Sequence, residues 1–445
     1  MRIAVCAAAA ALAVAPQAHA FCGFFVGKAD AKLFNRSSQV AIVRDGNRTV
    51  LTMSNDYQGP LDEFALVVPV PSVLERDQIH IGDRKLLERL DAYSSPRLVE
   101  YTDPDPCEQA YPMALSSGMR RKSLSATSAD RFDERSQALG VTVEAAYTVG
   151  EYDIVLLSAT QSRGLEIWLR QSGYQIPPRA ARALEPYVKQ DMKFFVAKVN
   201  LKEQKKTGYQ ELRPIQIAFD SPRFMLPIRL GMANAPAQGD TSQDLIVYML
   251  TRKGRVEASN YQTVRIPSEA NVPEFVKDEF ADFYRATFTR AWHERDGRAV
   301  FTEYAWNMAW CDPCSAQPLT ADELRGLGVF WAADTTPQRW GAPGGGTILT
   351  RLHVRYDPDR FPEDLMFQET GDQASFQGRY VMHHPFRGSA SCEAGDRYRQ
   401  TLADRRHEEA DTLARLTGWS PDMIRERMGP DATATPTKWW QRIWR

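Results

Sequence analysis

Residues 39–56 read QVAIVRDGNRTVLTMSND, and this stretch predicts the first element of the fold. Two runs rich in β-branched and apolar residues flank Asp45-Gly46-Asn47. An Asp-Gly pair between two such runs favours a β-hairpin, because glycine adopts the backbone conformation that a tight turn requires. Residues 64–71 (FALVVPVP) follow as a predicted buried strand that ends in prolines. We therefore expect the chain to begin its folded part with β-structure.

Working outward from the hairpin, predicted helices and strands alternate in an irregular order. Helical spacing of apolar residues predicts helices over 83–92, 273–294 (the longest) and 397–417, the last ended by Gly418. Further strands are predicted at 97–101, 141–148, 152–158, 193–200, 212–219, 223–229, 244–251, 261–266, 299–305 and 347–356. Because no βα unit recurs, we predict the α+β class, with mainly antiparallel sheets and interspersed helices.

The length suggests two or three packed subdomains, since domains commonly run to roughly 100–200 residues. We place boundaries near 205 and 310. The predicted parts are a leader (1–20), an N-terminal α+β domain (21–205), a β-rich segment with a long helix (206–310), a C-terminal α+β segment (311–430) and a tail rich in Trp and Arg (431–445).

Composition excludes several classes of protein. The chain is 43% hydrophobic and 25% charged, and its formal net charge is −1. These values are ordinary for a globular protein, so disorder is not the dominant state. A nearly balanced charge gives no electrostatic case for binding nucleic acid. After the leader, no apolar run approaches the roughly 20 residues that a membrane-spanning helix needs.

The N-terminus, MRIAVCAAAAALAVAPQAHA, has the pattern of a secretory signal peptide. Arg2 supplies the positive charge, an apolar run follows, and Ala18-His19-Ala20 is a small-x-small cleavage site. We predict cleavage after Ala20 and export to the periplasm or the extracellular space. An N-terminal anchor helix is the alternative, for which the apolar stretch is short.

Export places the mature chain where disulfides persist, and its five cysteines are Cys22, Cys107, Cys311, Cys314 and Cys392. Two bridges and one free thiol are the simplest arrangement. We favour a Cys22–Cys107 bridge. We expect the second bridge among Cys311, Cys314 and Cys392, with one of these left reduced.

Trp310-Cys311-Asp312-Pro313-Cys314 is the sharpest local motif. In thiol–disulfide exchange, Cys311 would attack as a thiolate and Cys314 would resolve the mixed disulfide. That chemistry usually places the motif at the start of a long helix, whereas Pro318 stands where this helix would run. A structural bridge is therefore the favoured interpretation. Zinc is a third, although no second ligand pair has the usual spacing.

Other signs of chemistry are weak, so we expect no metal and no cofactor. His383-His384 is the one histidine cluster, and neighbouring residues on a strand point to opposite faces. Residues 103–107 (DPDPC) could surround a calcium ion, but an exposed turn is the simpler interpretation. Nucleophile and phosphate-binding motifs are absent from the sequence. Whether the protein is an enzyme stays open, with a non-enzyme favoured.

The tail interleaves tryptophans with cations at Lys438, Trp439, Trp440, Arg442 and Trp444. Such residues suit a membrane interface, and peripheral contact with a membrane or an envelope protein is one hypothesis. The alternatives are docking on the protein's own surface through burial and cation–π contacts, and a disordered end.

Several stretches together resemble a known family. They are residues 21–59, 64–74 (FALVVPVPSVL), 95–107 (SPRLVEYTDPDPC), 301–314 (FTEYAWNMAWCDPC), 349–370 and 377–386 (QGRYVMHHPF). In these stretches the chain resembles the secreted bacterial family catalogued as domain of unknown function 2330. The resemblance implies export and one architecture across the family. It carries over no catalytic or ligand residue.

The leading hypothesis is an exported, non-catalytic cell-envelope or binding module, since no catalytic motif outweighs its structural interpretation. The alternative is a periplasmic thiol–disulfide oxidoreductase that uses Cys311 and Cys314. A hydrolase with an unrecognised site would show as a pocket with convergent polar groups. Partners and ligand are not identified by the sequence.

Overall fold

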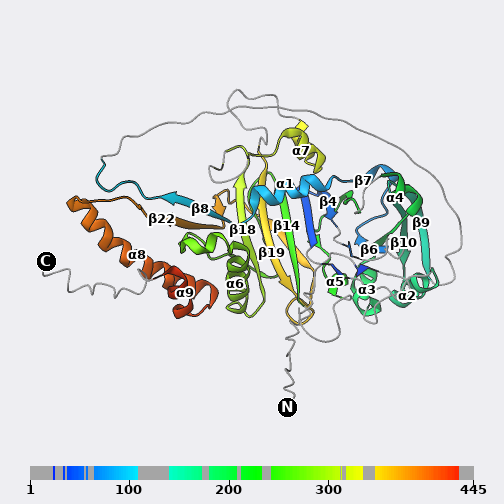
Figure 1. The fold of residues 1–445 in the computed structure, drawn as a ribbon. Coiled ribbons are helices and arrows are strands. Elements are labelled where there is room, and N and C mark those ends of the chain that lie inside the picture. Colours follow the sequence, from blue (N-terminus) through cyan, green and yellow to red (C-terminus); the bar gives the residue numbers. More distant parts are fainter. Residues whose placement is uncertain are drawn as a thin grey trace, which may run out of the picture.

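A computed structural model shows three adjoining parts (Figure 1). A large sheet stands in the middle, a second sheet with its helices lies at one end, and a helical lobe lies at the other. The structure describes residues 24–25, 34–35, 38–54, 57–58, 65–108, 140–172, 180–207, 212–232, 242–310, 312, 317–333 and 346–429.

The central sheet collects strands from most of the sequence. Its order is β16 (Gln262–Arg265), β18 (Ala299–Asn307), β19 (Ile348–Tyr356), β14 (Gln243–Thr251), β3 (Ser38–Asp45), β4 (Arg48–Ser54), β12 (Ile215–Asp220) and β7 (Ile79–Ile81). The short β21 (Phe376–Gln377) also pairs with β18. In this sheet β14–β3 and β16–β18 pair in parallel, and the other pairs are antiparallel.

The predicted hairpin is confirmed at β3 and β4. The two strands are antiparallel, with Asp45 opposite Arg48, and Gly46 at the turn has a φ of +60°. An L-residue with a side chain is disfavoured in this left-handed region, which explains the glycine. The predicted α+β class with mainly antiparallel sheets is also confirmed, because the described sheets pair mostly in the antiparallel sense and are interleaved with helices.

One face of the central sheet packs against a second, five-stranded sheet. The order of that sheet is β1 (Phe24–Phe25), β6 (Ala65–Val70), β11 (Lys193–Val199), β10 (Tyr152–Ala159) and β9 (Val141–Val149). Alternate residues such as Val40, Leu51, Leu66 and Phe195 meet in the largest core. The far face of this second sheet is covered by α2 (Ser162–Gln171) and α3 (Ala180–Lys189).

The opposite face of the central sheet is covered by α1 (Arg84–Ser94), α7 (Ala321–Gly326) and the 3-10 turn η5 (Phe330–Ala333). Because both faces are covered, β3 and β14 are apolar almost throughout. The remaining short elements are η2 (Arg76–Gln78), α4 (Leu201–Thr207), α5 (Arg229–Met232), the small sheet β13 (Met225–Leu226), β20 (Leu365–Glu369) and β15 (Val256–Ala258), and the pair β2 (Phe34–Asn35) and β5 (Tyr57–Gln58).

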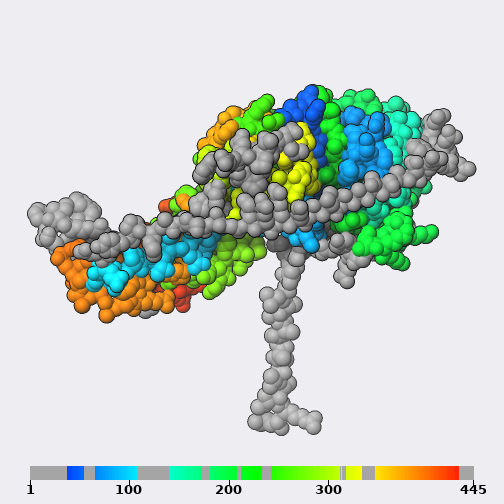
Figure 2. Space-filling model, turned by 90° about the horizontal axis from the view of Figure 1, so that it is seen from above, coloured from blue at the N-terminus to red at the C-terminus, as the bar shows by residue number. Residues whose placement is uncertain are grey.

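The third part, which we call the α8 lobe, is built on a small parallel sheet. Its strands are β17 (Ala270–Asn271), β22 (Arg379–His384) and β8 (Arg97–Thr102), and its helical elements are η4 (Glu274–Lys277), α6 (Phe280–His293), α8 (Glu393–Thr417) and α9 (Pro421–Met428). Seen from above in Figure 2, the cyan residues of β8 lie beside the orange residues of α8. In the part of the chain that the structure describes, no helix is long and apolar enough to cross a membrane.

The described elements do not follow the sequence boundaries that we predicted near 205 and 310. The central sheet takes β3 and β4 from before the first boundary, β14 from between the two, and β19 from after the second. The α8 lobe likewise combines β8 with β22. Strands from either side of each predicted boundary therefore pair with one another. The residue pattern does not encode this long-range pairing.

The longest predicted helix, 273–294, is interrupted. A 3-10 turn at η4 precedes α6, and Glu279, the N-cap of α6, has a φ of −125° and a ψ of 23°. Among the described helices α8 is longer, with 25 residues, and it ends as predicted at Gly418, whose φ is +75°. Glycine at this position closes the helix because it tolerates the left-handed conformation.

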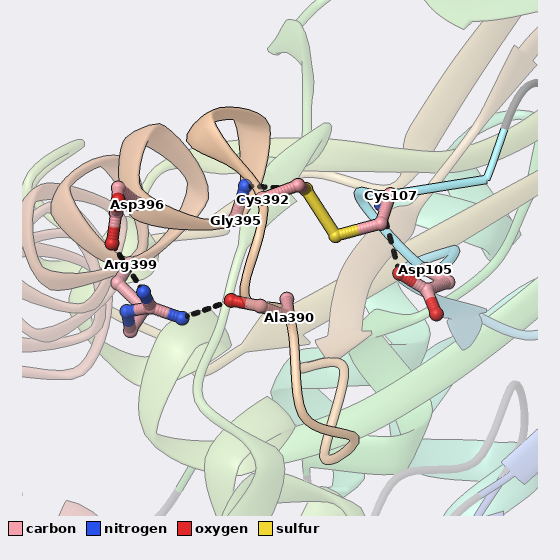
Figure 3. The surroundings of a disulfide bond; sticks show 7 residues. All are labelled: Asp105, Cys107, Ala390, Cys392, Gly395, Asp396 and Arg399. Atoms are coloured by element: carbon pink, nitrogen blue, oxygen red, sulfur yellow. Dashed lines mark hydrogen bonds and ion pairs between the residues drawn. A yellow bond between two sulfur atoms is a disulfide. The ribbon is translucent and has the colours of Figure 1, made fainter.

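A disulfide joins Cys107, just after β8, to Cys392, the N-cap of α8 (Figure 3). The predicted Cys22–Cys107 bridge is therefore wrong. Of the three pairings that we left open for the second bridge, the two that use Cys392 are wrong, and the Cys311–Cys314 pairing lies outside the described residues. The reason is topological: β8 and β22 are parallel neighbours, so the chain leaving β8 arrives where the chain leaving β22 enters α8. Cys22, Cys311 and Cys314 lie outside the described residues.

Both ends of the bridge are held by local contacts. The backbone N–H of Cys107 donates to the Asp105 carboxylate at 2.8 Å, and the N–H of Gly395 donates to Cys392 Sγ at 3.3 Å. Arg399 donates to the Ala390 carbonyl at 2.8 Å and also contacts Asp396, which ties the first turns of α8 to the segment before it (Figure 3).

We predict that the double variant Cys107→Ser/Cys392→Ser loses about 2–5 kcal/mol of unfolding free energy, because the bridge closes a very long loop. Urea denaturation of the oxidised wild type and of the variant measures the loss. Peptide mapping without reductant should recover the Cys107–Cys392 peptide from the wild type and from the control Cys22→Ser. A Cys22–Cys107 peptide in the wild type would contradict the structure.

Candidate functional site

Two groups of charged side chains are candidates for a functional site. The first, which we call the buried charge network, lies on the central sheet between β14, β18 and β19. Alternate residues of β19 (Arg351, His353 and Arg355) point to one face, where they meet Glu303 of β18 and Asp244 of β14. The strand period of two places the three cations in a row, and the neighbouring strands supply the acids.

Glu303 is the centre of this network. Its side chain is 1% exposed. One carboxylate oxygen accepts from Arg351 Nε at 2.6 Å, and the other lies 2.7 Å from His353 Nδ1 and also accepts from the Tyr284 hydroxyl of α6. His353 is stacked on the Phe288 ring of α6, with 3.7 Å between ring centroids. Glu303 therefore joins two strands of the sheet to a helix of the α8 lobe.

The outer members extend the network to other elements. Arg351 donates to Asp91 of α1 at 2.6 Å, and Arg355 forms two hydrogen bonds with Asp244, at 2.8 and 3.0 Å. His353 Nε2 lies 3.3 Å from the same aspartate. The network thus connects the sheet to α1 on one side and to α6 on the other.

The charges in this network stabilise one another. Burial raises the pKa of Glu303, but His353 and Arg351 outweigh it and lower that pKa to about 2. Burial lowers the pKa of His353, but Glu303 and Asp244 outweigh it and the net direction is upward. The charged forms are therefore the stable ones.

A carboxylate, a histidine and a second carboxylate in contact could in principle do acid–base chemistry. Here each charged group is already bonded to another, and none of these residues lines the three hollows described below. We therefore interpret the buried charge network as a structural device that docks the α8 lobe on the central sheet.

The second candidate site lies in the α8 lobe, where described residues line three hollows. The largest, the α6 groove, has a volume of about 740 Å³ and is bordered by α6, Thr417 and Trp419. Its cations are paired with its acids, Arg285 with Asp282 at 2.7 Å and Arg290 with Glu294 at 3.1 Å. Because these charges neutralise each other, the groove offers few unpaired charges that could select a ligand.

The other two hollows, of about 430 and 190 Å³, share Arg405 and Glu409 of α8 as common lining. We call them together the α8 trough. The larger is bordered by α8 and by residues 267–271, and the smaller by η4, α9 and the end of β22. The two shared side chains therefore line both hollows, of which the larger has the volume of a small-ligand site.

Arg405 is held by the segment that the disulfide fixes. Its two terminal nitrogens donate to the two carboxylate oxygens of Asp103, at 3.1 and 2.6 Å, and the Tyr398 hydroxyl donates to the same carboxylate at 2.6 Å. The Nε of Arg405 is buried without a hydrogen bond among the described residues, and it lies 3.6 Å from a carboxylate oxygen of Glu409.

Glu409 has an unusual environment for an acid. The residue is 6% exposed, and within the described ranges its carboxyl group has no hydrogen bond. Burial raises its pKa to about 7, and the opposing effect of Arg405 and Arg406 is too small to reverse this. A buried group with a perturbed pKa that lines a hollow is a recognised sign of a functional site.

The predicted site residues are only partly within the described chain. Cys311, Cys314 and the tail residues lie outside it: Lys438, Trp439, Trp440, Arg442 and Trp444. Between the two cysteines, Asp312 is buried and accepts from Tyr304 at 3.1 Å and from Gln377 at 3.0 Å. Trp310 beside them is 72% exposed.

His383 and His384 have separate partners, as expected for neighbours on a strand. His383 lies 3.6 Å from Asp103, whereas His384 lies 2.9 Å from Glu100 and 2.8 Å from Glu274. Across the residues that the structure describes, no three His, Cys, Asp or Glu side chains are arranged to hold a metal ion.

Sequence reasoning missed Glu409. A signal for it existed: Glu409 falls on the helical stripe that carries Leu402, Leu413 and Leu416 rather than on the polar side of α8. An acid on the apolar stripe of a helix is either paired or functional.

Comparison with known proteins shows the family of this chain. The profile of a family described as an uncharacterized protein conserved in bacteria (DUF2330) matches residues 16–368. The chain belongs to the DUF2330 family. Comparison with curated proteins and with solved structures gives no match. In this DUF2330 protein the matched range includes Asp103, Glu303 and η4, whereas α8 follows it.

We predict that Glu303→Gln destabilises the protein by about 3–5 kcal/mol, because it leaves the buried Arg351 and His353 without their shared counter-charge. The matched control is Glu88→Gln, which removes an exposed i,i+4 pair with Arg84 and should cost under about 0.5 kcal/mol. Thermal and urea unfolding at pH 7 measure both. Equal, small effects would show that the network does not hold the fold.

Glu409→Gln should act in the opposite direction, and its effect should depend on pH. A carboxyl group with a raised folded-state pKa stabilises the fold most below its ordinary value of 4.5 and loses that contribution as the pH rises through about 7. The neutral glutamine avoids this loss. The variant should therefore be more stable than the wild type at pH 8, by on the order of 2 kcal/mol, and nearly equal to it at pH 4.5.

The control for this comparison is Glu408→Gln, which changes the exposed neighbour and should shift stability by less than about 0.5 kcal/mol at either pH. Unfolding free energies at pH 4.5 and pH 8 decide the matter. If Glu409→Gln is destabilising at pH 8, the carboxylate is needed for folding and the trough is a structural feature.

Proposed function

We propose that this DUF2330 protein is an exported, non-catalytic binding module that holds a small polar ligand in the α8 trough. One observation carries the proposal. The carboxyl group of Glu409 belongs to a buried residue, has an ion-pair contact with Arg405 Nε at 3.6 Å but no hydrogen bond among the described residues, and lines two hollows of about 430 and 190 Å³. A ligand group that donates to this carboxylate would form a charge-assisted hydrogen bond, which typically contributes about 1.5–3 kcal/mol.

The non-catalytic part of the proposal is supported by the buried charge network. Glu303 and His353 have the residue types of acid–base catalysis, but they bond to each other and to Arg351 and Asp244. The α8 trough offers a perturbed acid without a nucleophile bonded to it. A binding site needs only such a polar group beside a hollow, whereas a site for group transfer also needs a nucleophile and a partner that activates it.

Export is supported by two features. The leader through Ala20 has the pattern of a signal peptide. The disulfide between Cys107 and Cys392 suits an oxidising compartment such as the periplasm. We further propose that the tail makes peripheral contact with a membrane or an envelope protein through Lys438, Trp439, Trp440, Arg442 and Trp444.

Native mass spectrometry tests the binding proposal. The protein is exposed to a small-molecule extract of the periplasm and then desalted. We expect a non-covalent adduct on the wild type that is absent from Thr412→Trp, which fills the larger hollow, and present on Thr401→Trp, which alters an exposed position of the same helix. The released molecule should have the same mass before and after a long incubation with the protein.

An adduct that is equally abundant on all three proteins, or on none, would contradict the proposal. A released molecule whose mass changes during incubation would contradict its non-catalytic part. Circular dichroism and mapping of the Cys107–Cys392 peptide confirm that each variant is folded.

A second candidate function is thiol–disulfide exchange at Cys311 and Cys314. The disulfide between Cys107 and Cys392 favours this function, because neither of them can then pair with Cys311 or Cys314. The exposed Trp310 offers an apolar contact next to them. Asp312, between the two, is anchored to the sheet.

The reduction potential of the pair tests this candidate. A value between about −120 and −270 mV would place it among exchange catalysts, and Cys311→Ser/Cys314→Ser would then abolish insulin reduction without unfolding the protein. A value below about −300 mV would mark a structural bridge. In that case the double variant should lose stability instead.

A further inference from the structure

The N-terminal part of α8, residues 393–408, is weakly packed. Within this stretch Gly395 is the one buried residue. The residues through which α8 joins the apolar core of the lobe all come later in the helix: Ala410, Leu413, Ala414 and Leu416. Part of the stretch borders the smaller hollow of the trough instead. Polar and covalent contacts must therefore hold this part of the helix in place.

These contacts come from the segment that follows β8. Asp103 accepts hydrogen bonds from Tyr398 and from both terminal nitrogens of Arg405. Four residues later, Cys107 is joined by the disulfide to Cys392, the N-cap of α8. Two of the three residues between Asp103 and Cys107 are prolines, which restrict the backbone. The disulfide therefore keeps the Asp103 segment against the N-terminal part of α8.

The two sulfurs of the bridge have different surroundings (Figure 3). Cys107 is an exposed residue. Cys392 is partly buried, and its Sγ accepts the backbone N–H of Gly395 at 3.3 Å in the first turn of α8. A helix N-terminus stabilises a thiolate, and a stabilised thiolate leaves faster in thiol–disulfide exchange. An incoming thiol therefore has better access to Cys107, and Cys392 is the better leaving group.

We propose that the Cys107–Cys392 disulfide is a redox switch, which a dithiol opens by attack at Cys107 and which then releases the N-terminal part of α8 from the Asp103 segment. Reduced thiol–disulfide oxidoreductases present two neighbouring thiols of this kind. The inference goes beyond the proposed function, because it concerns the disulfide and the helix whether or not the trough holds a ligand.

The exchange takes place in two steps. The first thiolate of the dithiol bonds to Cys107 Sγ, the bond from Cys107 to Cys392 breaks, and its electron pair stays on Cys392. The second thiolate of the dithiol then attacks the first, and Cys107 leaves as a thiolate. The dithiol is oxidised to a disulfide and loses two electrons and two protons. The two protein cysteines take up the electrons, and the protons reach them through water.

Opening the switch should also change the α8 trough. Arg405 lines both hollows, and Asp103 fixes its position. When the Asp103 segment is released, Arg405 loses this restraint and the lining is no longer held in one arrangement. A ligand in the trough should then dissociate more readily. This consequence rests on the proposed function, whereas the switch does not.

Hydrogen–deuterium exchange of the full mature protein, with dithiothreitol as the dithiol, tests the switch. We expect reduction to speed exchange in peptides from 393–408 by about tenfold or more, and to leave peptides from β14, β19 and 409–417 within about twofold. Reoxidation should restore slow exchange. The variant Cys107→Ser/Cys392→Ser should exchange fast in 393–408 before any reductant is added, and the control Cys22→Ser should match the wild type.

Two results would overturn the switch. One is unchanged exchange in 393–408 although peptide mapping shows that the bridge is open. The other is lost protection throughout β14 and β19, since the bridge would then be required by the whole fold. Both are read on the reduced wild type, so the proposal stays testable even where the double variant does not fold.

A monothiol identifies the sulfur that is attacked. Glutathione treatment followed by alkylation of free thiols should place glutathione on Cys107 and the alkyl group on Cys392, with a preference of about fivefold or more over the reverse. The reverse preference would overturn the proposed direction of attack.

The periplasmic adduct separates the switch from the proposed function. We expect the adduct to be lost when the bridge is reduced. An adduct that persists on the reduced protein would contradict the effect on the trough. If no adduct forms on the oxidised protein, the binding module fails, and the exchange rates of 393–408 alone decide whether the switch stands.

Discussion

The arrangement of the molecule depends on the contacts that the buried Glu303 carboxylate makes. This carboxylate lies in the sheet with almost no exposure, and Arg351, His353 and Tyr284 all contact it. A charge buried in this way is tolerated only when counter-charges surround it. Because one of its partners comes from α6, and α6 packs against α8, the same contact sets the position of the lobe that contains the trough. The disulfide from Cys107 to Cys392 closes that lobe at its other end.

Glu409 shows what the same residue type does when its nearest counter-charge forms its hydrogen bonds with another acid. Both glutamates are buried, yet the pKa of Glu303 is lowered to about 2 and that of Glu409 is raised to about 7. The difference lies in the neighbours: Arg351 and His353 bond directly to Glu303, whereas Arg405 hydrogen-bonds to Asp103 and approaches Glu409 only to 3.6 Å. A protein that only needed stability would gain by replacing Glu409 with a neutral residue, so its presence beside a hollow favours a binding role.

The predictions that succeeded depend on local chemistry. The hairpin at Gly46 and the end of α8 at Gly418 follow from glycine's freedom to adopt a positive φ. The α+β class follows from the periodicity of apolar residues. The pairing of Cys107 with Cys392 could not be predicted, because it depends on β8 and β22 lying side by side although they are far apart in sequence. The alternation of Arg351, His353 and Arg355 predicts a half-buried strand, whereas the face they share is covered by α6 and α1. Glu409 was missed although it falls on the apolar stripe of α8, because the hollows beside it are formed by segments that are distant in sequence.

One measurement tests the contrast between the two glutamates directly. Carbon-13 labelling of glutamate side-chain carboxyl groups reports ionisation across a pH titration, and Glu303→Gln and Glu409→Gln assign the two signals. The account predicts that Glu303 stays ionised from pH 8 down to about 3, and that Glu409 titrates near 7. A Glu303 signal that titrates near neutral pH would contradict the docking role of the network. A Glu409 signal that titrates at its ordinary value near 4.5 would contradict the proposed trough site.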